Sequence, residues 1–442
     1  MSEPIYFSRR IDAELVKWKD SGLRKPLLLR GARQVGKSSA VRHLSEQFDS
    51  YIEVNFELDE HVARVFEHDL RPDRICADLE SLYHTHITDG KTLLFFDEIQ
   101  ACPRAISALR FFCEQRRSLH VIAAGSLLEF ALAELPSFGV GRIQSLFMYP
   151  FSFAEYLNVV NPIIHGQLLA KRDLTPLSPV IHEMLTKYLR TFMLIGGMPE
   201  VVRTWADHGS YLDCEQIQAD IISTYTDDFA KYKTRISPLV LRETWQSVAN
   251  QACSKFVYSA VSGGFDGTRV KEALELLQMA GLVIPVTHTA ANGVPFGAQS
   301  NHKFRKMLPL DNGLMLRQLG LRTGDLLLDS DTDLVCKGSL AEVFAGLELL
   351  KSGNPRVREE LYYWLNLKKD RQAEVDYLTA VHGRMIPVEV KAGTRGSMQS
   401  LYYFLQLKNL PYGIRTSMEP FSEMEKVHII PLYALGTMLD SL

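Results

Sequence analysis

Residues 25–38 read KPLLLRGARQVGKS, and this stretch decides which fold the N-terminal part of the chain adopts. A short apolar run leads into a loop with glycines at positions 31 and 36, and SSAVRHLSEQF then has the pattern of a helix. Residues 31–38 fit G-x-x-x-x-G-K-[ST] at every required position. This order of strand, glycine loop and helix predicts a phosphate-binding loop at the end of a buried strand.

The loop backbone and two of its side chains are the expected contacts of a nucleotide. Gly31 and Gly36 let the backbone turn so that its N–H groups face phosphates, and the N-terminus of the next helix adds a favourable dipole. Lys37 would reach the β- and γ-phosphates, and the Ser38 hydroxyl would ligate Mg²⁺. The expected nucleotide-binding residues are Gly31, Ala32, Arg33, Gln34, Val35, Gly36, Lys37, Ser38 and Ser39. The alternative is a glycine turn that only joins a strand to a helix.

Paired carboxylates follow a second apolar run, TLLFFDE at 92–98. Asp97 at this strand end would hold magnesium through water, and Glu98 would orient and deprotonate the attacking water. The alternative is a solvated strand end, which Asp-Glu pairs often form.

A third apolar run, HVIAAGS, ends at Ser126, and Arg142 lies in the loop region after it. The Ser126 hydroxyl would sense the γ-phosphate or the attacking water, or it would cap a helix start. Arg142 would reach a nucleotide in a neighbouring subunit and stabilise transition-state charge, or it would pair with a surface acid. Both alternatives stay open for each residue.

Continuous apolar strands separated by helices favour an α/β fold with a parallel sheet covered on both faces. Helices dominate after residue 150, and a later helical stretch followed by LVIPVTHT and KFRKMLPL resembles a winged-helix module. We expect four parts: an ATPase core at 1–150, a helical lid at 151–235, a winged-helix-like module at 236–312 and a further α/β domain at 313–442.

Together the motifs GARQVGKS, LLFFDEIQ, AAGSLLEF, a GR before YPFSFAEY, and IGGMPE resemble those of prokaryotic AAA-type ATPases of the STAND-like branch. The resemblance extends to GSLAEVFAGLELL and to EVDYL…IPVEVKAG, and members of that family share a C-terminal domain of unknown function. It implies that Lys37 and Ser38 bind nucleotide and metal, and that Asp97 and Glu98 serve Mg²⁺ and the water. Ser39 departs from the family, where many relatives have Thr.

Residues 374–391, EVDYLTAVHGRMIPVEVK, predict a hairpin with unexpected charges inside it. Alternation puts Glu374, Asp376 and Leu378 on one face of the first strand. Asp376 would then lie close to Glu389 and Lys391 of the second strand. Two carboxylates this close repel unless a cation lies between them, so Asp376 and Glu389 are candidate ligands of Mg²⁺ or Mn²⁺. Lys391 would position or deprotonate a water near a scissile phosphate.

This arrangement resembles the PD-(D/E)xK nuclease core, in which a helix bearing Glu precedes a meander with Asp and E-x-K. Glu342 matches the helix Glu, Asp376 the Asp, and Glu389 and Lys391 the E-x-K; Val375 departs where the motif name has Pro. Two other interpretations remain: a structural ion cluster at a sheet edge, and a nuclease fold kept only for binding.

The 442 residues carry a net charge of −3, so nucleic acid would have to bind at a local patch. Lys303, Arg305 and Lys306 around Phe304 form one basic cluster, and Lys368, Lys369 and Arg371 form another; a solvated surface is the alternative for both. Six scattered cysteines without a C-x-x-C pair, and no apolar run long enough to span a bilayer, indicate a cytoplasmic protein with reduced thiols.

The sequence therefore predicts a magnesium-dependent ATPase whose nucleotide cycle controls a DNA-directed, nuclease-like C-terminal domain. The expected cofactors are ATP and Mg²⁺, with Mg²⁺ or Mn²⁺ at the C-terminal site. The expected partners are DNA and a second copy of the chain in a homo-oligomer. The alternative is a nucleotide-gated switch or DNA-binding regulator with no nuclease chemistry.

Overall fold

The computed structural model describes residues 5–134, 141–232, 235–322, 337–367, 373–393 and 397–439. The chain divides into two compact units, which are described separately. Unit 1 comprises Met1–Tyr149 with two short later segments, Met279–Gly281 and Asn354–Arg358. Unit 2 comprises Pro150–Gln278, Leu282–Gly353 and Glu359–Leu442.

Unit 1 is built on a five-stranded sheet in which all neighbours run parallel, in the order β2-β3-β4-β1-β5. Every residue of β3 and β4 is buried, as the uninterrupted apolar runs predict for strands covered on both faces. The strands are β1 Leu27–Arg30, β2 Ser50–Asn55, β3 Thr92–Asp97, β4 His120–Ala124 and β5 Gln144–Phe147.

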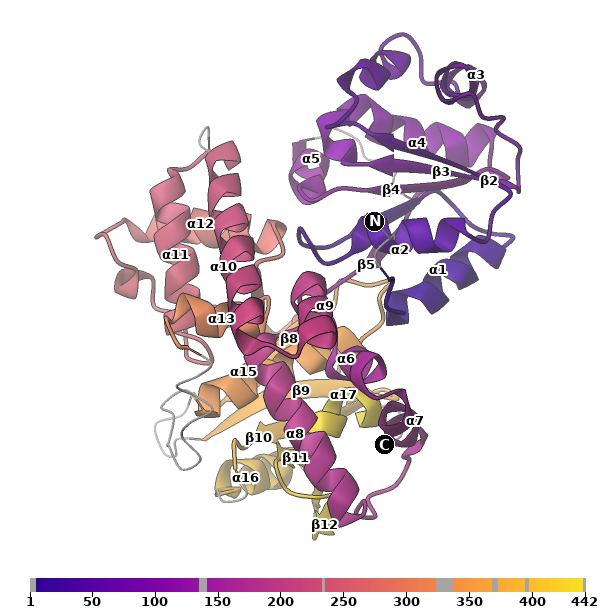
Figure 1. The fold of residues 1–442 in the computed structure, drawn as a ribbon. Coiled ribbons are helices and arrows are strands. Elements are labelled where there is room, and N and C mark those ends of the chain that lie inside the picture. The colour runs from indigo at the N-terminus through magenta and orange to yellow at the C-terminus, as the bar shows by residue number, and fades with distance from the viewer. Residues whose placement is uncertain are drawn as a thin grey trace. The chain divides into compact units, whose positions relative to one another are not determined.

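Helices lie on both faces of this sheet (Figure 1). On one face, α3 and α4 share a core with alternate strand residues such as Leu28, Leu94 and Phe96. On the other face, α1 buries Leu15 and Trp18, and α2 contacts β3 and β4. The helices are α1 Arg10–Asp20, α2 Lys37–Ser45, α3 Pro72–Tyr83, α4 Pro103–Gln115 and α5 Leu128–Glu134, with short 3₁₀ turns η1 Glu60–Phe66 and η2 Ile99–Ala101.

The segment 354–358 packs against unit 1 although it follows far later in the chain. The Phe147 amide donates to the Pro355 carbonyl at 2.7 Å, next to the end of β5. The Arg356 guanidinium donates to Glu14 of α1 at 3.0 Å. Unit 1 therefore includes backbone that the first 149 residues do not supply.

Unit 2 begins with helices, as the sequence predicts for residues 151–235. They are α6 Phe153–Val160, α7 Pro162–Ala170, α8 Pro179–Ile195, α9 Pro199–His208 and α10 Tyr211–Asp228, followed by η3 Phe229–Tyr232. Further helices are α11 Pro238–Asn250, α12 Gly267–Met279, α13 Asn312–Gln318, α15 Lys337–Ser352, α16 Gln399–Lys408 and α17 Leu435–Met438, with short turns η4 Tyr258–Ala260, η5 Phe296–Gln299 and η6 Leu432–Ala434.

The IGGMPE stretch forms a tight turn between α8 and α9. Gly196 has a φ of 77°, and the Gly197 amide donates to the buried Asp311 carboxylate at 2.6 Å. A Cβ on Gly197 would lie 2.3 Å from the Phe151 carbonyl oxygen. The glycine pair is therefore explained by close backbone approach within unit 2.

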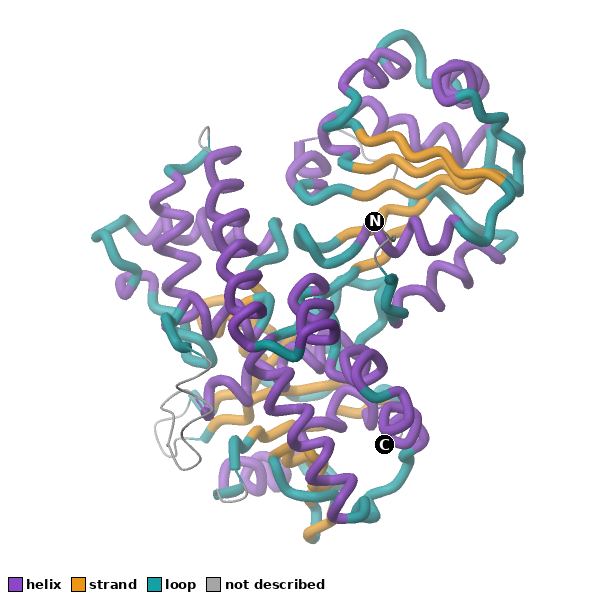
Figure 2. The backbone as a smooth tube through the Cα atoms, in the orientation of Figure 1, coloured by secondary structure: helices purple, strands orange, loops and turns teal. Residues whose placement is uncertain are grey.

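An eight-stranded sheet forms the other half of unit 2, and its strands are drawn in orange in Figure 2. Its order is β12-β13-β11-β10-β9-β8-β6-β7, with parallel and antiparallel neighbours. The strands are β6 Val283–Thr289, β7 Ser300–Pro309, β8 Leu361–Leu365, β9 Glu374–Val381, β10 Arg384–Val390, β11 Gly413–Ser417, β12 Ser422–Met424 and β13 Val427–Pro431.

The strands expected as the wing of a separate module belong to this sheet. β6 and β7 do pair as an antiparallel hairpin, but β6 also pairs in parallel with β8, Val286 opposite Leu361. The structure thus differs from the expected division into 236–312 and 313–442. A hairpin pattern predicts that two strands pair with each other. It does not predict which other strand pairs with the free edge of the hairpin.

A β-bulge changes which residues of β9 share a face. Tyr362 lies opposite Leu378, but Trp364 lies opposite Val375, so β9 carries one extra residue between these pairs. Leu378 therefore joins Val375 in the core under Phe404 of α16. The expectation that Leu378 shares the face of Glu374 and Asp376 is wrong because strict alternation does not hold across the bulge.

Within the described part of the chain, no helix combines the length and apolar character that a bilayer crossing requires.

Candidate functional site

The loop after β1 has the backbone that the glycine pattern predicts. Gly31, Gln34 and Gly36 have φ values of 150°, 62° and 97°, and α2 begins at Lys37 directly after the left-handed Gly36. A Cβ on Gly31 would lie 2.1 Å from the Met148 carbonyl oxygen, so only glycine fits there. Ala32 and Val35 are buried, Arg33 is partly exposed and Ser39 is exposed.

Lys37 lies folded back over its own loop. Its ammonium donates to the carbonyls of Gly31 at 3.0 Å and Ala32 at 2.7 Å. Burial lowers the pKa of Lys37 to about 8, and the charges of Glu98 and Asp97 oppose this shift. A buried ammonium without a full counter-charge is suited to bind an anion such as a phosphate.

Ser38 and Asp97 meet across the sheet edge. The Ser38 hydroxyl donates to Asp97 Oδ2 at 2.9 Å. Burial raises the pKa of Asp97, the hydrogen bond from Ser38 opposes this, and the charge of Glu98 raises it further. A hydroxyl and a carboxylate side by side are the hard oxygen ligands that Mg²⁺ prefers.

Glu98 and Ser126 also come together. Glu98 has a left-handed backbone, φ 47° and ψ 42°, which is rare for a non-glycine residue and clusters at functional sites. Its Oε2 accepts hydrogen bonds from Gln100 Nε2 at 2.7 Å, from the Ser126 amide at 3.2 Å and from the Ser126 hydroxyl at 3.3 Å. β4 lies between β1 and β3, so its end places Ser126 beside the carboxylates.

Three residues of this site were not among the predicted site residues. The buried Arg9 donates to the Val35 carbonyl at 3.2 Å and to the Tyr149 carbonyl at 2.8 Å, and so it braces the loop. Gln100 holds Glu98, and Gly125 makes room for it: a Cβ on Gly125 would lie 1.9 Å from Gln100 Oε1. The glycine in AAGS was a visible hint, whereas nothing distinguished Arg9 from its neighbour Arg10.

Arg142 lies on the surface of unit 1 and forms an ion pair with Glu114 of α4. Its side chain is 52% exposed. This is the surface pairing that we considered as one of two alternatives for Arg142.

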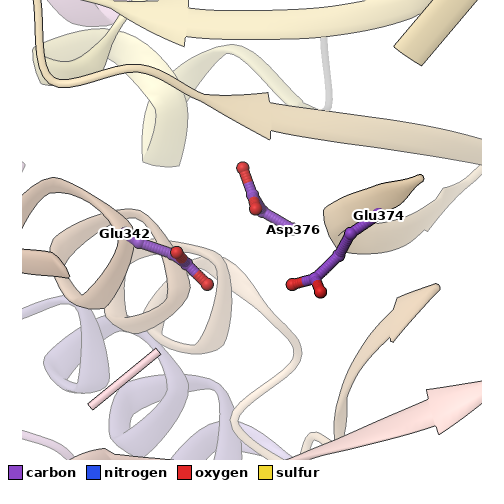
Figure 3. A group of neighbouring side chains, drawn as sticks. All are labelled: Glu342, Glu374 and Asp376. Carbon is purple, nitrogen blue, oxygen red and sulfur yellow. The ribbon is translucent and has the colours of Figure 1, made fainter. Parts of the chain in front are cut away.

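A second group of carboxylates lies in unit 2. Glu342 of α15 and Glu374 and Asp376 of β9 each offer an oxygen within 4.8 Å of the others, and Figure 3 shows the three side chains converging. We call this group the acidic cluster. Glu374 is the member that we did not predict as a ligand, although it shares the face of Asp376.

Lys306 of β7 reaches into the acidic cluster. Its ammonium donates to Glu342 Oε1 at 2.8 Å and also forms an ion pair with Glu374. Burial raises the pKa of Glu342, and the charge of Asp376 raises it further while Lys306 opposes the shift. Burial alone would lower the pKa of Lys306, but the neighbouring carboxylates outweigh it and the pKa is raised.

Glu389 and Lys391 lie beside the acidic cluster rather than in it. Lys391 Nζ donates to Glu389 Oε1 at 2.6 Å, and the Val390 amide donates to Asp376 at 2.8 Å. Burial raises the pKa of Glu389, and so does the charge of Asp376. The buried Glu389 Oε2 has no hydrogen-bond partner among the described residues. The structure thus brings Asp376 near Glu389, as predicted, but groups it more tightly with Glu342 and Glu374.

The basic cluster of β7 is only partly on the surface. Lys303 is exposed and Arg305 is half-buried against His302, whereas Lys306 is 3% exposed and so cannot contact a phosphate backbone. Strand alternation turns Lys306 inward. The exposed Lys255 lies with Nζ 4.3 Å from the Phe304 ring and adds a charge that we did not predict. Lys368, Lys369 and Arg371 lie outside the described residues.

Three family comparisons cover most of the chain in separate segments. Residues 23–157 match the AAA domain family (AAA_14), residues 186–325 match a domain of unknown function (DUF8612), and residues 337–435 match another (DUF4143). The first match covers the loop at 31–38 and the carboxylates Asp97 and Glu98 at the end of β3. Together with their geometry, it supports an AAA-type P-loop ATPase domain in unit 1.

No curated protein matches the chain. Among solved structures, Aeropyrum pernix ORC1 in complex with DNA is 13% identical, with a TM-score of 0.30, and the match covers 74% of this chain and 96% of that one. For unliganded Pif1 from Bacteroides sp the identity is 14%, the TM-score 0.22 and the coverage 38% and 50%; for the S. cerevisiae Hsp104–ADP complex they are 12%, 0.27, and 63% and 38%. These TM-scores are low, so the fold argument rests on the sheet and the AAA match.

Proposed function

We propose that this chain hydrolyses ATP with magnesium in unit 1 and uses the nucleotide cycle to switch unit 2. The observation that carries the proposal is the meeting of Ser38, Asp97, Glu98 and Ser126 at one sheet edge, beside a loop whose lysine is buried. These groups supply phosphate binding, metal ligands and a base in one place, which is what phosphoryl transfer to water requires.

Each side chain has a distinct proposed role. Lys37 and the N–H groups of residues 31–38 bind the β- and γ-phosphates. Glu98 orients the attacking water and takes its proton, while ADP leaves with the electrons of the broken P–O bond. Ser126 and Gln100 hold the Glu98 carboxylate in position.

Ser38 and Asp97 are the residues that would hold magnesium, because they present a hydroxyl and a carboxylate oxygen 2.9 Å apart. When bound, the ion would supply charge neutralisation at the β- and γ-phosphates.

The test compares Glu98→Gln with Lys37→Ala. Lys37→Ala should lose ATP binding, measured by calorimetry. Glu98→Gln should bind ATP but lose hydrolysis by about 10²–10⁴-fold, the usual contribution of a general base. Glu114→Gln, an exposed acid of the same unit, is the matched control and should leave both unchanged. Hydrolysis at the wild-type rate by Glu98→Gln would rule out this base.

For unit 2 we favour DNA binding without cleavage over the nuclease reading. The observation in its favour is the position of Lys306 inside the acidic cluster, where a nuclease would hold its metal ion. The nuclease alternative is supported by the proximity of Asp376, Glu389 and Lys391. Plasmid nicking with Mg²⁺ or Mn²⁺ separates them: nicking that disappears in Asp376→Asn and Lys391→Ala, and survives Glu98→Gln, would establish cleavage.

We propose that DNA contacts the exposed charges around Phe304. Lys255 and Lys303 lie on this surface, and Arg305 is partly exposed there. Lys303→Ala should weaken binding across sequences and reduce the salt dependence by about one phosphate contact. Unchanged affinity and salt dependence in both Lys255→Ala and Lys303→Ala would exclude this surface.

Arg142 tests whether a second copy of the chain completes the site. If Arg142 acts in trans, Arg142→Ala should lose ATP hydrolysis, and mixing it with Glu98→Gln subunits should restore part of the rate. If Arg142 only pairs with Glu114, its loss should leave the rate unchanged, and Glu114→Ala should behave in the same way.

A further inference from the structure

Lys306 is more deeply buried than Glu342 and Glu374, two of the acids around it. Its side chain is 3% exposed, against 16% for Glu342 and 37% for Glu374. The three acids come from α15 and β9, and the ammonium comes from β7, an edge strand of the same sheet. Burying an ammonium is costly unless carboxylates surround it. The acids of the cluster therefore stabilise the Lys306 ammonium in its buried position.

We propose that the Lys306 ammonium is the resident cation of the acidic cluster and that it excludes a divalent metal ion from it. The ammonium donates to Glu342 and pairs with Glu374. These are two of the three carboxylates that would each offer an oxygen to an ion. A divalent cation needs these same lone pairs at about 2.0–2.6 Å. It would also stand next to a fixed positive charge.

The backbone holds Lys306 in this place from both sides. On one side β7 pairs with β6, Lys306 opposite Val286. On the other side Lys306 forms a bridge with Lys255, and the Phe256 amide donates to the Arg305 carbonyl at 2.8 Å. The ammonium also lies 5.0 Å from the centre of the Tyr363 ring, a favourable cation–π distance. The backbone at Lys306 is therefore fixed on both sides, and the ammonium lies between the carboxylates and the Tyr363 ring.

The three acids resemble a metal site, yet Lys306 and the Val390 amide bind them from within the chain. This role of Lys306 does not depend on ATP hydrolysis in unit 1. It supports unit 2 as a module that binds without cutting, because metal-assisted hydrolysis requires an ion that can coordinate water and phosphate.

The experiment uses terbium(III) as the probe, on the full chain without nucleotide and in an Asp97→Asn background that removes the proposed metal ligand of unit 1. Tyrosine sensitises terbium luminescence at short range, and Tyr363 lies beside the position of the ammonium. The wild-type cluster should give no emission that depends on Tyr363. Lys306→Met, which removes the charge but keeps the length, should gain saturable emission that the protein with Lys306 lacks.

Matched variants locate the ion. Tyr363→Phe should reduce the gained emission, to which Tyr377 beside Glu342 also contributes. Glu374→Gln should weaken terbium binding, and Lys306→Arg should behave as wild type. Emission in the Lys306 protein that falls with Tyr363→Phe would overturn the proposal, as would a folded Lys306→Met protein without gained emission. If Lys306→Met does not fold in metal-free buffer, Mn²⁺ during refolding should recover it, and no recovery would also overturn the proposal.

Discussion

Arg9 supports the nucleotide loop from outside the motif. It is buried, and its guanidinium donates to the carbonyls of Val35 and Tyr149. A charged hydrogen bond to a buried carbonyl is worth roughly 1.5–3 kcal/mol. We expect Arg9→Ala to loosen the loop and raise KM for ATP several-fold, with a smaller effect on kcat.

Steady-state ATPase kinetics and thermal melting of Arg9→Ala check this expectation. Arg10→Ala, an exposed neighbour, serves as the control and should keep the wild-type KM. Arg9→Lys should fall between them because one ammonium cannot span both carbonyls as the guanidinium does. An unchanged KM in Arg9→Ala would mean that the loop holds its shape without this brace.

Glu348 should make the stability of unit 2 depend on pH. It is buried in α15, accepts the Phe153 amide at 3.1 Å and lies 3.5 Å from Lys351. Burial raises the pKa of Glu348, while Lys351 and the Phe153 amide oppose the shift and the charge of Glu155 adds to it. Above pH 4.5 the unfolded chain therefore releases a proton that the folded chain retains.

The free energy of unfolding should consequently fall as pH rises from 4.5 toward the raised folded pKa. Glu348→Gln cannot ionise, so its unfolding free energy should fall less steeply over the same range. Denaturant titrations at several pH values measure both slopes. Parallel slopes for the two proteins would show that Glu348 does not titrate between the folded and unfolded states.

The sequence predicted some residues of the nucleotide site and not others, for a physical reason. Parallel strand ends meet at one edge, so the motifs alone predict that Ser38 and Asp97 lie near each other, and the structure has them 2.9 Å apart. Arg9 and Gln100 act through contacts with backbone or side chains whose positions depend on the folded chain. No local pattern marks such residues.

At the scale of elements, two helical glycines have different surroundings: one lies in close packing and the other has open space around it. Gly313 lies in α13, where a Cβ would come within 2.3 Å of the Ile195 carbonyl oxygen and 2.5 Å of Gln218 Nε2. Gly166 lies in α7, where a Cβ would meet nothing within 4 Å. The same substitution should therefore have opposite effects at the two positions.

Gly313→Ala should destabilise the protein by about 1–3 kcal/mol through overpacking. Gly166→Ala should be neutral or stabilise by about 0.5–1 kcal/mol because alanine favours helix. Chemical denaturation of both variants gives the two values. Equal effects would indicate that α13 can move away from α8 without cost.

The bulge in β9 is a feature that the sequence did not predict. Alternation in EVDYLTAV predicts a strand, and the structure has one at Glu374–Val381. The extra residue opposite β8 moves Leu378 to the face of Val375. A bulge depends on the partner strand, and the partner lies at 361–365, where the sequence does not show its register.

At the scale of the whole molecule, the chain has two compact units with separate cores. We therefore expect a bound nucleotide to stabilise the two units unequally. A ligand at 100 times its dissociation constant adds about 2.7 kcal/mol to the state that binds it. For a unit of this size that corresponds to a shift in melting temperature of roughly 5–10 °C. We expect ATP with Mg²⁺ to move the calorimetric transition of unit 1 and to leave that of unit 2 unchanged.

Lys37→Ala should abolish this shift, and Asp376→Asn, in unit 2, should retain it. Equal movement of every transition in the wild type would mean that the two cores unfold as one.

The sequence predicted a change of structure near residue 150, because composition and element type change there. The union of β6 and β7 with the C-terminal strands was not predictable, since pairing between β6 and β8 joins segments far apart in sequence.

The segments 279–281 and 354–358 of unit 1 have a consequence for synthesis of the protein on the ribosome. Translation at about 5–20 residues per second delivers Pro355 roughly 10–40 s after Tyr149. During this interval the nascent N-terminal sheet has β5 without its backbone partner from Pro355. Unit 1 can thus reach its final form only after Pro355 has been translated, although its motif at 31–38 is translated much earlier.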